Sequence, residues 1–197
     1  MEDKNLYVIA GCNGAGKTTA SFTILPEIIN CQEFINADEI AKGLSPFQSE
    51  KVAFEAGRIM LKRINELISN ECSFAFETTL ASRSYREKIY NAKEKGYNVT
   101  LLFFLLENVE LAKARVASRV KEGGHNIPED VIERRYYTGI KYLFEIYFSI
   151  VDGLLIFDNS FGKPAIIAQR INSELVVLNN RKFNMLKEIY DRTRKTN

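Results

Sequence analysis

The feature that most constrains this chain is the run Gly-Cys-Asn-Gly-Ala-Gly-Lys-Thr at residues 11–18, which matches the phosphate-binding pattern G-x-x-x-x-G-K-[ST] in full. The apolar residues 6–10 precede it, and a helix-compatible stretch follows it. A strand that ends in a glycine-rich turn and leads into a helix directs several backbone N–H groups and the positive end of the helix dipole at one point. Because such a point attracts anions, we expect a polyphosphate there rather than an ordinary turn.

Each residue of this loop has an expected role. The glycines allow the backbone to curl around a β-phosphate without Cβ clashes, Lys17 bridges the β- and γ-phosphates, and the Thr18 hydroxyl ligates Mg²⁺. The expected cofactors are therefore ATP and Mg²⁺. The residues expected to bind the nucleotide are Gly11, Asn13, Gly14, Ala15, Gly16, Lys17, Thr18 and Thr19, with Asp158 and Asn159 near the adenine or its ribose. A simple turn is the alternative for the last two.

The composition narrows the class of protein. The 197 residues, 46% hydrophobic and 26% charged, are typical of one globular α/β domain, and a net charge of +2 gives no reason to expect nucleic acid as a partner. Because no apolar run approaches the length of a membrane span, we expect a cytoplasmic protein without membrane contact. Cys12, Cys31 and Cys72 form no C-x-x-C pair, which disfavours a disulfide framework and a zinc site.

Strand-like and helix-like segments alternate along the chain. The expected strands are residues 6–10, 33–36, 73–76, 98–106 and 153–157, and the expected helices are residues 17–29, 49–70, 82–95, 109–121 and 128–150. This alternation predicts a three-layer P-loop sandwich with a five-stranded parallel sheet. Residues 166–171 and 175–178 predict an edge hairpin around Asn172-Ser173, and residues 181–194 predict a terminal amphipathic helix. We expect residues 1–197 to form a single domain.

Polar residues follow three of the expected strands at their carboxyl ends, at residues 36–38, 77–79 and 158–160, where ligands of open α/β sheets bind. We expect Asp38 to act as the general base that takes the proton of a substrate hydroxyl, with helix capping as the alternative role. Glu77, followed by Thr78, is expected to hold a Mg²⁺-bound water or to fix a substrate hydroxyl, and the sequence leaves both roles open. A solvated strand-end carboxylate is the third alternative for Glu77.

Arginines on both sides of the pair Gly123-Gly124 predict a helical lid over approximately residues 115–136. Such a lid would cover the triphosphate, neutralise transferring charge and exclude water. The candidate arginines are Arg119, Arg134 and Arg135, with Arg115 in reserve. A surface helical hairpin with solvated arginines is the alternative. His125, the single histidine, is a candidate phosphate or substrate contact and not a catalyst.

Taken together, these segments resemble the zeta toxin family of P-loop kinases. The matching segments are residues 11–19, 35–41, 76–80, 123–125 with 134–136, and 158–160. The resemblance implies that Lys17 binds phosphates, Asp38 activates the acceptor hydroxyl, Glu77 contacts the substrate or the metal shell, and the lid arginines stabilise the transferring phosphoryl group. It further implies a nucleotide sugar such as UDP-N-acetylglucosamine as acceptor and an antitoxin as a partner that blocks the ATP site.

The sequence lacks the signatures of two other nucleotide-binding classes. The L-S-G-G-Q signature of ABC transporter ATPases and the N-K-x-D guanine motif of GTPases do not occur in it. Two alternatives stay open beside a small-molecule kinase: a nucleoside or nucleotide monophosphate kinase, and a sensor module that binds ATP without useful transfer. A carboxylate at position 38 favours a kinase, because a sensor needs no base beside the acceptor. We expect a monomer or a small oligomer.

Overall fold

A single mixed sheet organises the chain. The structure, a computed structural model, describes residues 3–27, 31–124, 126–171 and 174–195. Within these ranges seven strands pair in the order β2-β3-β1-β4-β5-β6-β7. The strands are β1 (Asn5–Ala10), β2 (Phe34–Ile35), β3 (Phe74–Thr78), β4 (Asn98–Leu105), β5 (Gly153–Asp158), β6 (Ala165–Ile171) and β7 (Glu174–Val177). The pairs from β2 to β5 are parallel, and those of β6 with β5 and β7 are antiparallel.

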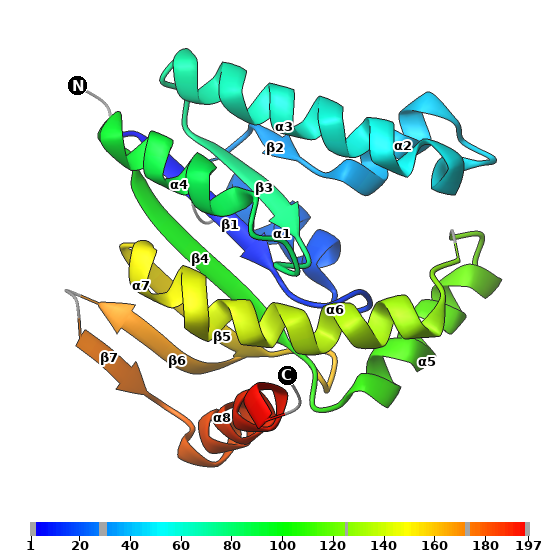
Figure 1. Cartoon of the computed structure of the whole chain (residues 1–197), viewed down its shortest axis with the longest axis vertical. Coiled ribbons are helices and arrows are strands. Elements are labelled where there is room, and N and C mark those ends of the chain that lie inside the picture. Colours follow the sequence, from blue (N-terminus) through cyan, green and yellow to red (C-terminus); the bar gives the residue numbers. More distant parts are fainter. Residues whose placement is uncertain (1–2, 28–30, 125, 172–173, 196–197) are drawn as a thin grey trace.

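Helices cover both faces of this sheet. They are α1 (Lys17–Glu27), α2 (Ala37–Leu44), α3 (Ala53–Ser69), α4 (Tyr85–Glu94), α5 (Val109–Lys121), α6 (Glu129–Tyr142), α7 (Phe148–Ile150) and α8 (Asn180–Lys195), with a 3₁₀ turn η1 (Ser49–Val52) and a π-helical turn η2 (Leu143–Tyr147). Figure 1 shows α4 and the continuous helix of α6, η2 and α7 in front of the strands, with α1 behind β3. This is the α/β arrangement that the alternating segments predicted.

The core lies around the central strands β1, β3 and β4. Strands covered on both faces are apolar in continuous runs rather than alternating, and β4 follows this rule from Leu101 to Leu105, where every residue is buried. Phe74 and Phe76 of β3 and Leu6 and Val8 of β1 are also inaccessible to solvent. The phosphate loop thus leaves the carboxyl end of a strand that is fixed on both sides.

Several boundaries differ from the prediction. The hairpin strands β6 and β7 continue the main sheet, so the predicted five strands become part of a sheet of seven among the described residues. The segment predicted as one helix over residues 49–70 begins as a 3₁₀ turn, and the helix predicted over 128–150 contains a π turn. Helix α2 was not predicted as an element of its own. The turn pair Asn172-Ser173 lies outside the described residues.

None of the helices in the described ranges combines the length and apolarity needed to cross a bilayer.

Two phenylalanines, one buried in the core and one exposed, should differ sharply in their contribution to stability. Phe76 is fully buried and stacks on Tyr85 with 5.0 Å between ring centroids, whereas Phe47 is 97% exposed. We expect Phe76→Ala to lower the free energy of unfolding by about 3–5 kcal/mol, because it removes buried contacts and leaves a cavity. The control Phe47→Ala should change it by less than about 0.5 kcal/mol. Urea unfolding followed by circular dichroism measures both, and equal losses would contradict this description of the core.

Candidate active site

The phosphate loop joins β1 to α1 in a conformation that requires glycine. Gly11, Gly14 and Gly16 have φ angles of 144°, 78° and 77°, a region that residues with a Cβ rarely adopt. A Cβ on Gly16 would also lie 2.5 Å from the side-chain nitrogen of Asn159, and one on Gly11 would collide with the carbonyl oxygen of Phe104. The loop is therefore shaped by its own backbone and by the strand ends that surround it.

Lys17 extends into the loop from the first turn of α1. It is only 6% exposed, its Nζ donates to the carbonyl oxygen of Cys12 at 2.9 Å, and it lies 3.5 Å from Oε1 of Glu77. A buried ammonium needs a counterion, and Glu77 supplies it. The positive charge that a phosphate loop requires is thus held in place by the acid at the end of β3.

Glu77 also binds two polar side chains. The Thr18 hydroxyl donates to Oε2 of Glu77 at 2.8 Å, and the Asn36 amide donates to the same oxygen at 3.0 Å. The side-chain oxygen of Asn36 in turn accepts from the backbone N–H of Asp38 at 2.8 Å and caps α2. Because Asn36 makes this capping bond, the carboxylate of Asp38 is not required for it.

The oxygens of Thr18 and Glu77 are the hard ligands that Mg²⁺ prefers. Among the described residues there is no group of three or more His, Cys, Asp or Glu side chains that would hold a metal by itself. This donor set fits a Mg²⁺ ion that takes most of its ligands from nucleotide phosphates and water.

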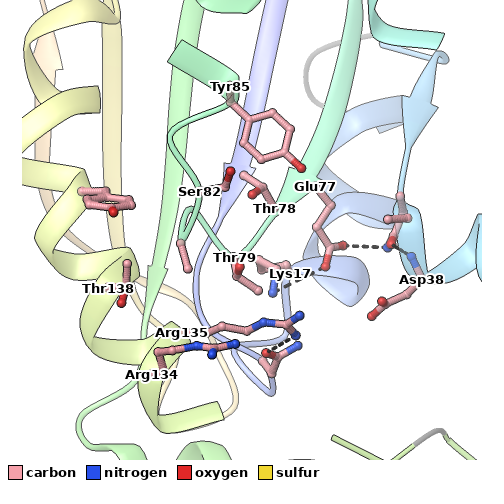
Figure 2. Close-up of a pocket in the computed structure, with 15 residues that line it drawn as sticks. Lys17, Asp38, Glu77, Thr78, Thr79, Ser82, Tyr85, Arg134, Arg135 and Thr138 are labelled. Carbon is pink, nitrogen blue, oxygen red and sulfur yellow. Dashed lines mark hydrogen bonds and ion pairs between the residues drawn. The ribbon is translucent and has the colours of Figure 1, made fainter. Parts of the chain in front are cut away.

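Asp38 faces a cavity of about 550 Å³ in front of the phosphate loop (Figure 2). Lys17 and Glu77 lie at its base, and the arginines of α6 lie on the opposite wall. The residues that line it are Asn13, Lys17, Asn36, Ala37, Asp38, Glu77, Thr78, Thr79, Ala81, Ser82, Tyr85, Arg134, Arg135, Thr138 and Tyr142. The structure therefore brings Lys17, Asp38, Glu77 and the two arginines of α6 together from four separate segments of the chain.

Arg135 connects this cavity to the phosphate loop. Its Nη1 donates to the side-chain oxygen of Asn13 at 3.2 Å. Burial lowers the pKa of the Arg135 guanidinium, the Asp38 charge acts to raise it, and neighbouring Arg134 lowers it further. A partly buried guanidinium next to the loop has lost part of its hydration, which an anion could replace.

Two other lid candidates are placed differently. Arg119 is not among the residues that line the cavity, and its Nε and Nη2 atoms are buried without a hydrogen-bond partner. The glycine turn encloses it, since a Cβ on Gly124 would lie 2.7 Å from its Cγ. His125 lies outside the described residues.

The two residues predicted to lie near the adenine or its ribose, Asp158 and Asn159, have different surroundings. Asn159 donates from its side chain to the carbonyl oxygen of Ala15 at 2.7 Å and so supports the phosphate loop from behind. It also lines a second cavity of about 430 Å³, with Gly16, Thr19, Ala20, Arg115, Gly162 and Pro164. Asp158 lines neither cavity. Its carboxylate accepts from the Ser160 hydroxyl at 2.5 Å and lies 3.0 Å from Nζ of Lys182, which ties the end of β5 to α8.

Sequence reasoning missed part of the cavity wall. Asn36 was not among the residues expected at the site, although its position two residues before Asp38 is typical of a helix cap. Thr138 and Tyr142 follow Arg134 at four-residue intervals, which places all three on one face of α6. That spacing was available in the sequence. The participation of Ser82 and Tyr85 had no comparable signal, because only the chain path after β3 brings them there.

Comparison with known proteins assigns the family. The zeta toxin family model matches residues 1–160, and the chain belongs to the zeta toxin family. An uncharacterized protein of Haemophilus influenzae is 32% identical over 136 residues, which cover 69% of this chain and 94% of that protein.

Solved structures share the fold. AvrRxo1-ORF1:-ORF2 with ATP superposes with a TM-score of 0.76 at 18% identity, over 95% of this chain and 64% of that one. A structure from the PezAT chromosomal toxin–antitoxin system of Streptococcus pneumoniae gives 0.67 at 16% identity, over 98% and 88%. A gluconokinase from Sinorhizobium meliloti gives 0.52 at 16% identity, over 96% and 89%. This chain therefore spans just under two thirds of the AvrRxo1 chain and has the fold of P-loop kinases.

The Asp158 environment predicts a pH dependence of stability. Burial would raise the pKa of Asp158, but hydrogen bonds from Ser160 and Lys182 outweigh it and lower the pKa below its ordinary value of 3.8. Its stabilising effect is then complete above that value and is lost as the pH falls through the lowered pKa. We expect Asp158→Asn to cost about 1.5–3 kcal/mol at pH 7 and to flatten the decline of stability below pH 4.

Denaturant unfolding between pH 2 and pH 7 measures this effect. Glu110→Gln is the matched control, because Glu110 is 76% exposed and pairs with Lys113 on the surface. It should leave the curve unchanged. If both variants followed the wild-type curve, the bonds to Asp158 would contribute nothing measurable.

Proposed function

We propose that this protein is a Mg²⁺-ATP-dependent kinase that transfers the γ-phosphoryl group to a hydroxyl of a small molecule. One observation carries the proposal: Lys17 of the phosphate loop, the Asp38 carboxylate and the Arg135 guanidinium all line the same cavity. A phosphoryl transfer needs a cation at the phosphates, a base at the acceptor and positive charge opposite them. Membership of the zeta toxin family supports the same conclusion.

The phosphate loop binds the triphosphate of ATP. Its backbone N–H groups and Lys17 contact the phosphate oxygens, and the Thr18 hydroxyl is a ligand for Mg²⁺, with Glu77 acting through a bound water. When bound, Mg²⁺ would neutralise negative charge on the phosphate oxygens. The second cavity, between Arg115 and Pro164, is open to the nucleobase.

The acceptor lies between Asp38 and the wall formed by α6 and the segment after β3. Asp38 takes the proton of the acceptor hydroxyl as its oxygen attacks the γ-phosphorus, and the bond to the β-phosphate oxygen breaks to release ADP. Arg134 and Arg135 stabilise the transferring charge, with Arg119 as a further candidate from the lid. Hydroxyl groups that line the cavity are suited to a polyhydroxylated acceptor, and they belong to Thr78, Thr79, Ser82, Tyr85, Thr138 and Tyr142.

The family also suggests an acceptor and a partner. A nucleotide sugar such as UDP-N-acetylglucosamine is the acceptor to test first, because it offers the hydroxyls that this lining can bind. An antitoxin is the proposed protein partner, and its support is the similarity to the PezAT toxin–antitoxin structure. Nucleosides and nucleoside monophosphates belong in the same acceptor panel.

Two substitutions test the kinase. We expect Lys17→Ala to abolish transfer from labelled ATP, and Asp38→Asn to reduce turnover by about two to four orders of magnitude while leaving ATP affinity nearly unchanged. The reason is that Asp38 contacts the acceptor and not the phosphate loop. Radiolabel transfer to a panel of nucleotide sugars, nucleosides and small alcohols measures turnover, and calorimetric titration measures ATP affinity.

The outcomes separate the proposal from its alternatives. Slow hydrolysis that is unaffected by Asp38→Asn, with no labelled acceptor, would favour a nucleotide sensor. Transfer to nucleoside monophosphates alone would favour a nucleotide kinase. Loss of ATP binding in Asp38→Asn would assign that residue a structural role.

A further inference from the structure

The segment after β3 forms part of the cavity wall, and we call residues 79–84 the acceptor loop. Thr79, Ala81 and Ser82 of this loop line the cavity. Leu80 is fully buried with a φ angle of 60°, a left-handed conformation that is unfavourable for a leucine. Its backbone N–H donates to the Thr78 hydroxyl at 3.0 Å. Such a conformation persists only where the surroundings hold it.

The continuous helix of α6, η2 and α7 contacts the acceptor loop at three points. The Tyr147 hydroxyl donates to the carbonyl oxygen of Ser82. Nε of Arg83 donates to the Tyr142 hydroxyl at 3.2 Å, and the guanidinium carbon lies 5.3 Å from the centre of that ring. Gly139 packs so closely that a Cβ there would lie 2.6 Å from the carbonyl oxygen of Thr79.

The π turn explains how one helix reaches both the cavity and the loop. In an α-helix the positions that share a face are three or four residues apart, and Arg134, Thr138 and Tyr142 follow that spacing into the cavity. The next residue in an α-helical series would be position 146. The π turn at Leu143–Tyr147 inserts one residue, so that Tyr147 comes next on the loop side. Single π turns of this kind are frequent at functional sites.

Tyr147 is suited to hold the acceptor loop against the helix at all times. Its side chain is fully buried, and burial raises its pKa above the ordinary value near 10, so the hydroxyl keeps its proton at any physiological pH. A buried hydroxyl that lost its acceptor would lose a bond it cannot replace with water. The bond therefore holds the backbone of Ser82 against the helix that carries Arg134 and Arg135.

We propose that Tyr147 and Gly139 are positioning residues that clamp the acceptor loop to this helix and so set where the phosphoryl acceptor sits relative to the arginines. The inference rests on the proposed kinase function. It makes the cavity wall one rigid unit, in which the loop that contacts the acceptor and the cations that face the γ-phosphate move together. Neither residue lines the cavity, so each acts through the loop.

The chain offers a matched control for each position. Tyr136 lies on α6, is almost fully buried, and donates to the carbonyl oxygen of Leu106 at 2.9 Å, away from the acceptor loop. Tyr147→Phe and Tyr136→Phe therefore remove the same kind of bond from the same helix. Gly57 is also within a helix, but a Cβ there would meet no atom within 4 Å. Gly57→Ala is thus the control for Gly139→Ala.

The experiment compares Michaelis constants in the full-length chain. The panel acceptor that gives the strongest transfer with wild-type protein, starting with UDP-N-acetylglucosamine, is titrated at saturating ATP, and ATP is titrated at saturating acceptor. We expect Tyr147→Phe and Gly139→Ala to raise the KM for the acceptor by about three- to tenfold, because the first removes one hydrogen bond and the added Cβ of the second displaces the Thr79 carbonyl. The KM for ATP should stay within about twofold of wild type. Hydrogen exchange at residues 79–84 should be faster in both variants.

The outcomes distinguish the clamp from the kinase. If wild-type protein transfers phosphate to no acceptor in the panel, the proposed function fails, and the positioning role with it. If wild-type protein transfers phosphate but Tyr147→Phe matches Tyr136→Phe in acceptor KM, or raises both Michaelis constants equally, the clamp alone is overturned. Unchanged exchange at residues 79–84 in both Tyr147→Phe and Gly139→Ala would overturn it as well. A raised acceptor KM in Gly139→Ala but not in Gly57→Ala supports it independently of Tyr147.

Discussion

The Glu77 carboxylate connects the parts of this site. It lies at the end of a buried strand, is 9% exposed, and serves as counterion to Lys17 while accepting hydrogen bonds from Thr18 and Asn36. These partners come from α1 and from the junction of β2 and α2. Breaking a buried ion pair by removing one partner typically costs about 3–5 kcal/mol, because a charge is left without compensation. Glu77, together with the Asn36 amide that also lies 3.5 Å from the Thr18 hydroxyl, therefore links the phosphate loop to the Asp38 segment.

The opposite side of the loop is supported by Asn159, which follows β5, and by residues near the end of that strand. Asn159 binds the carbonyl oxygen of Ala15, and Arg115 binds that of Ser160 at 2.9 Å. Lys182, from α8, bridges Asp158 and Glu107 at 3.0 Å and 3.1 Å. Helix α8 lies beyond the region that matches the family, residues 1–160, yet it fixes the strand end next to the loop. Helix α8 thus contributes to the geometry next to the phosphate loop.

The fold could be predicted from sequence where periodicity was clear. Strand β4 is a long apolar run, and α5 was predicted with the bounds that the structure shows. Helix α2 was missed although Ala37, Ile40, Ala41 and Leu44 have helical spacing over its eight residues, so this signal was available in the sequence. The hairpin strands β6 and β7 lie at one edge of the sheet, as expected, whereas the antiparallel pairing of β6 with β5 was not predicted.

The sequence by itself determined the phosphate loop, because its glycines, Lys17 and Thr18 are close together in the chain. The turn depends on backbone conformations that glycine adopts readily and other residues do not. The sequence also indicated the strand-end acids Asp38 and Glu77, since parallel strands bring their carboxyl ends to one edge. Only the tertiary structure decided that Asn36 caps α2, that Asp158 is held by Lys182, and that Tyr147 holds the loop after β3. The Asp158 and Tyr147 contacts join segments distant in sequence and the Asn36 contact is local, but all three depend on the direction of each side chain once the helices pack on the sheet.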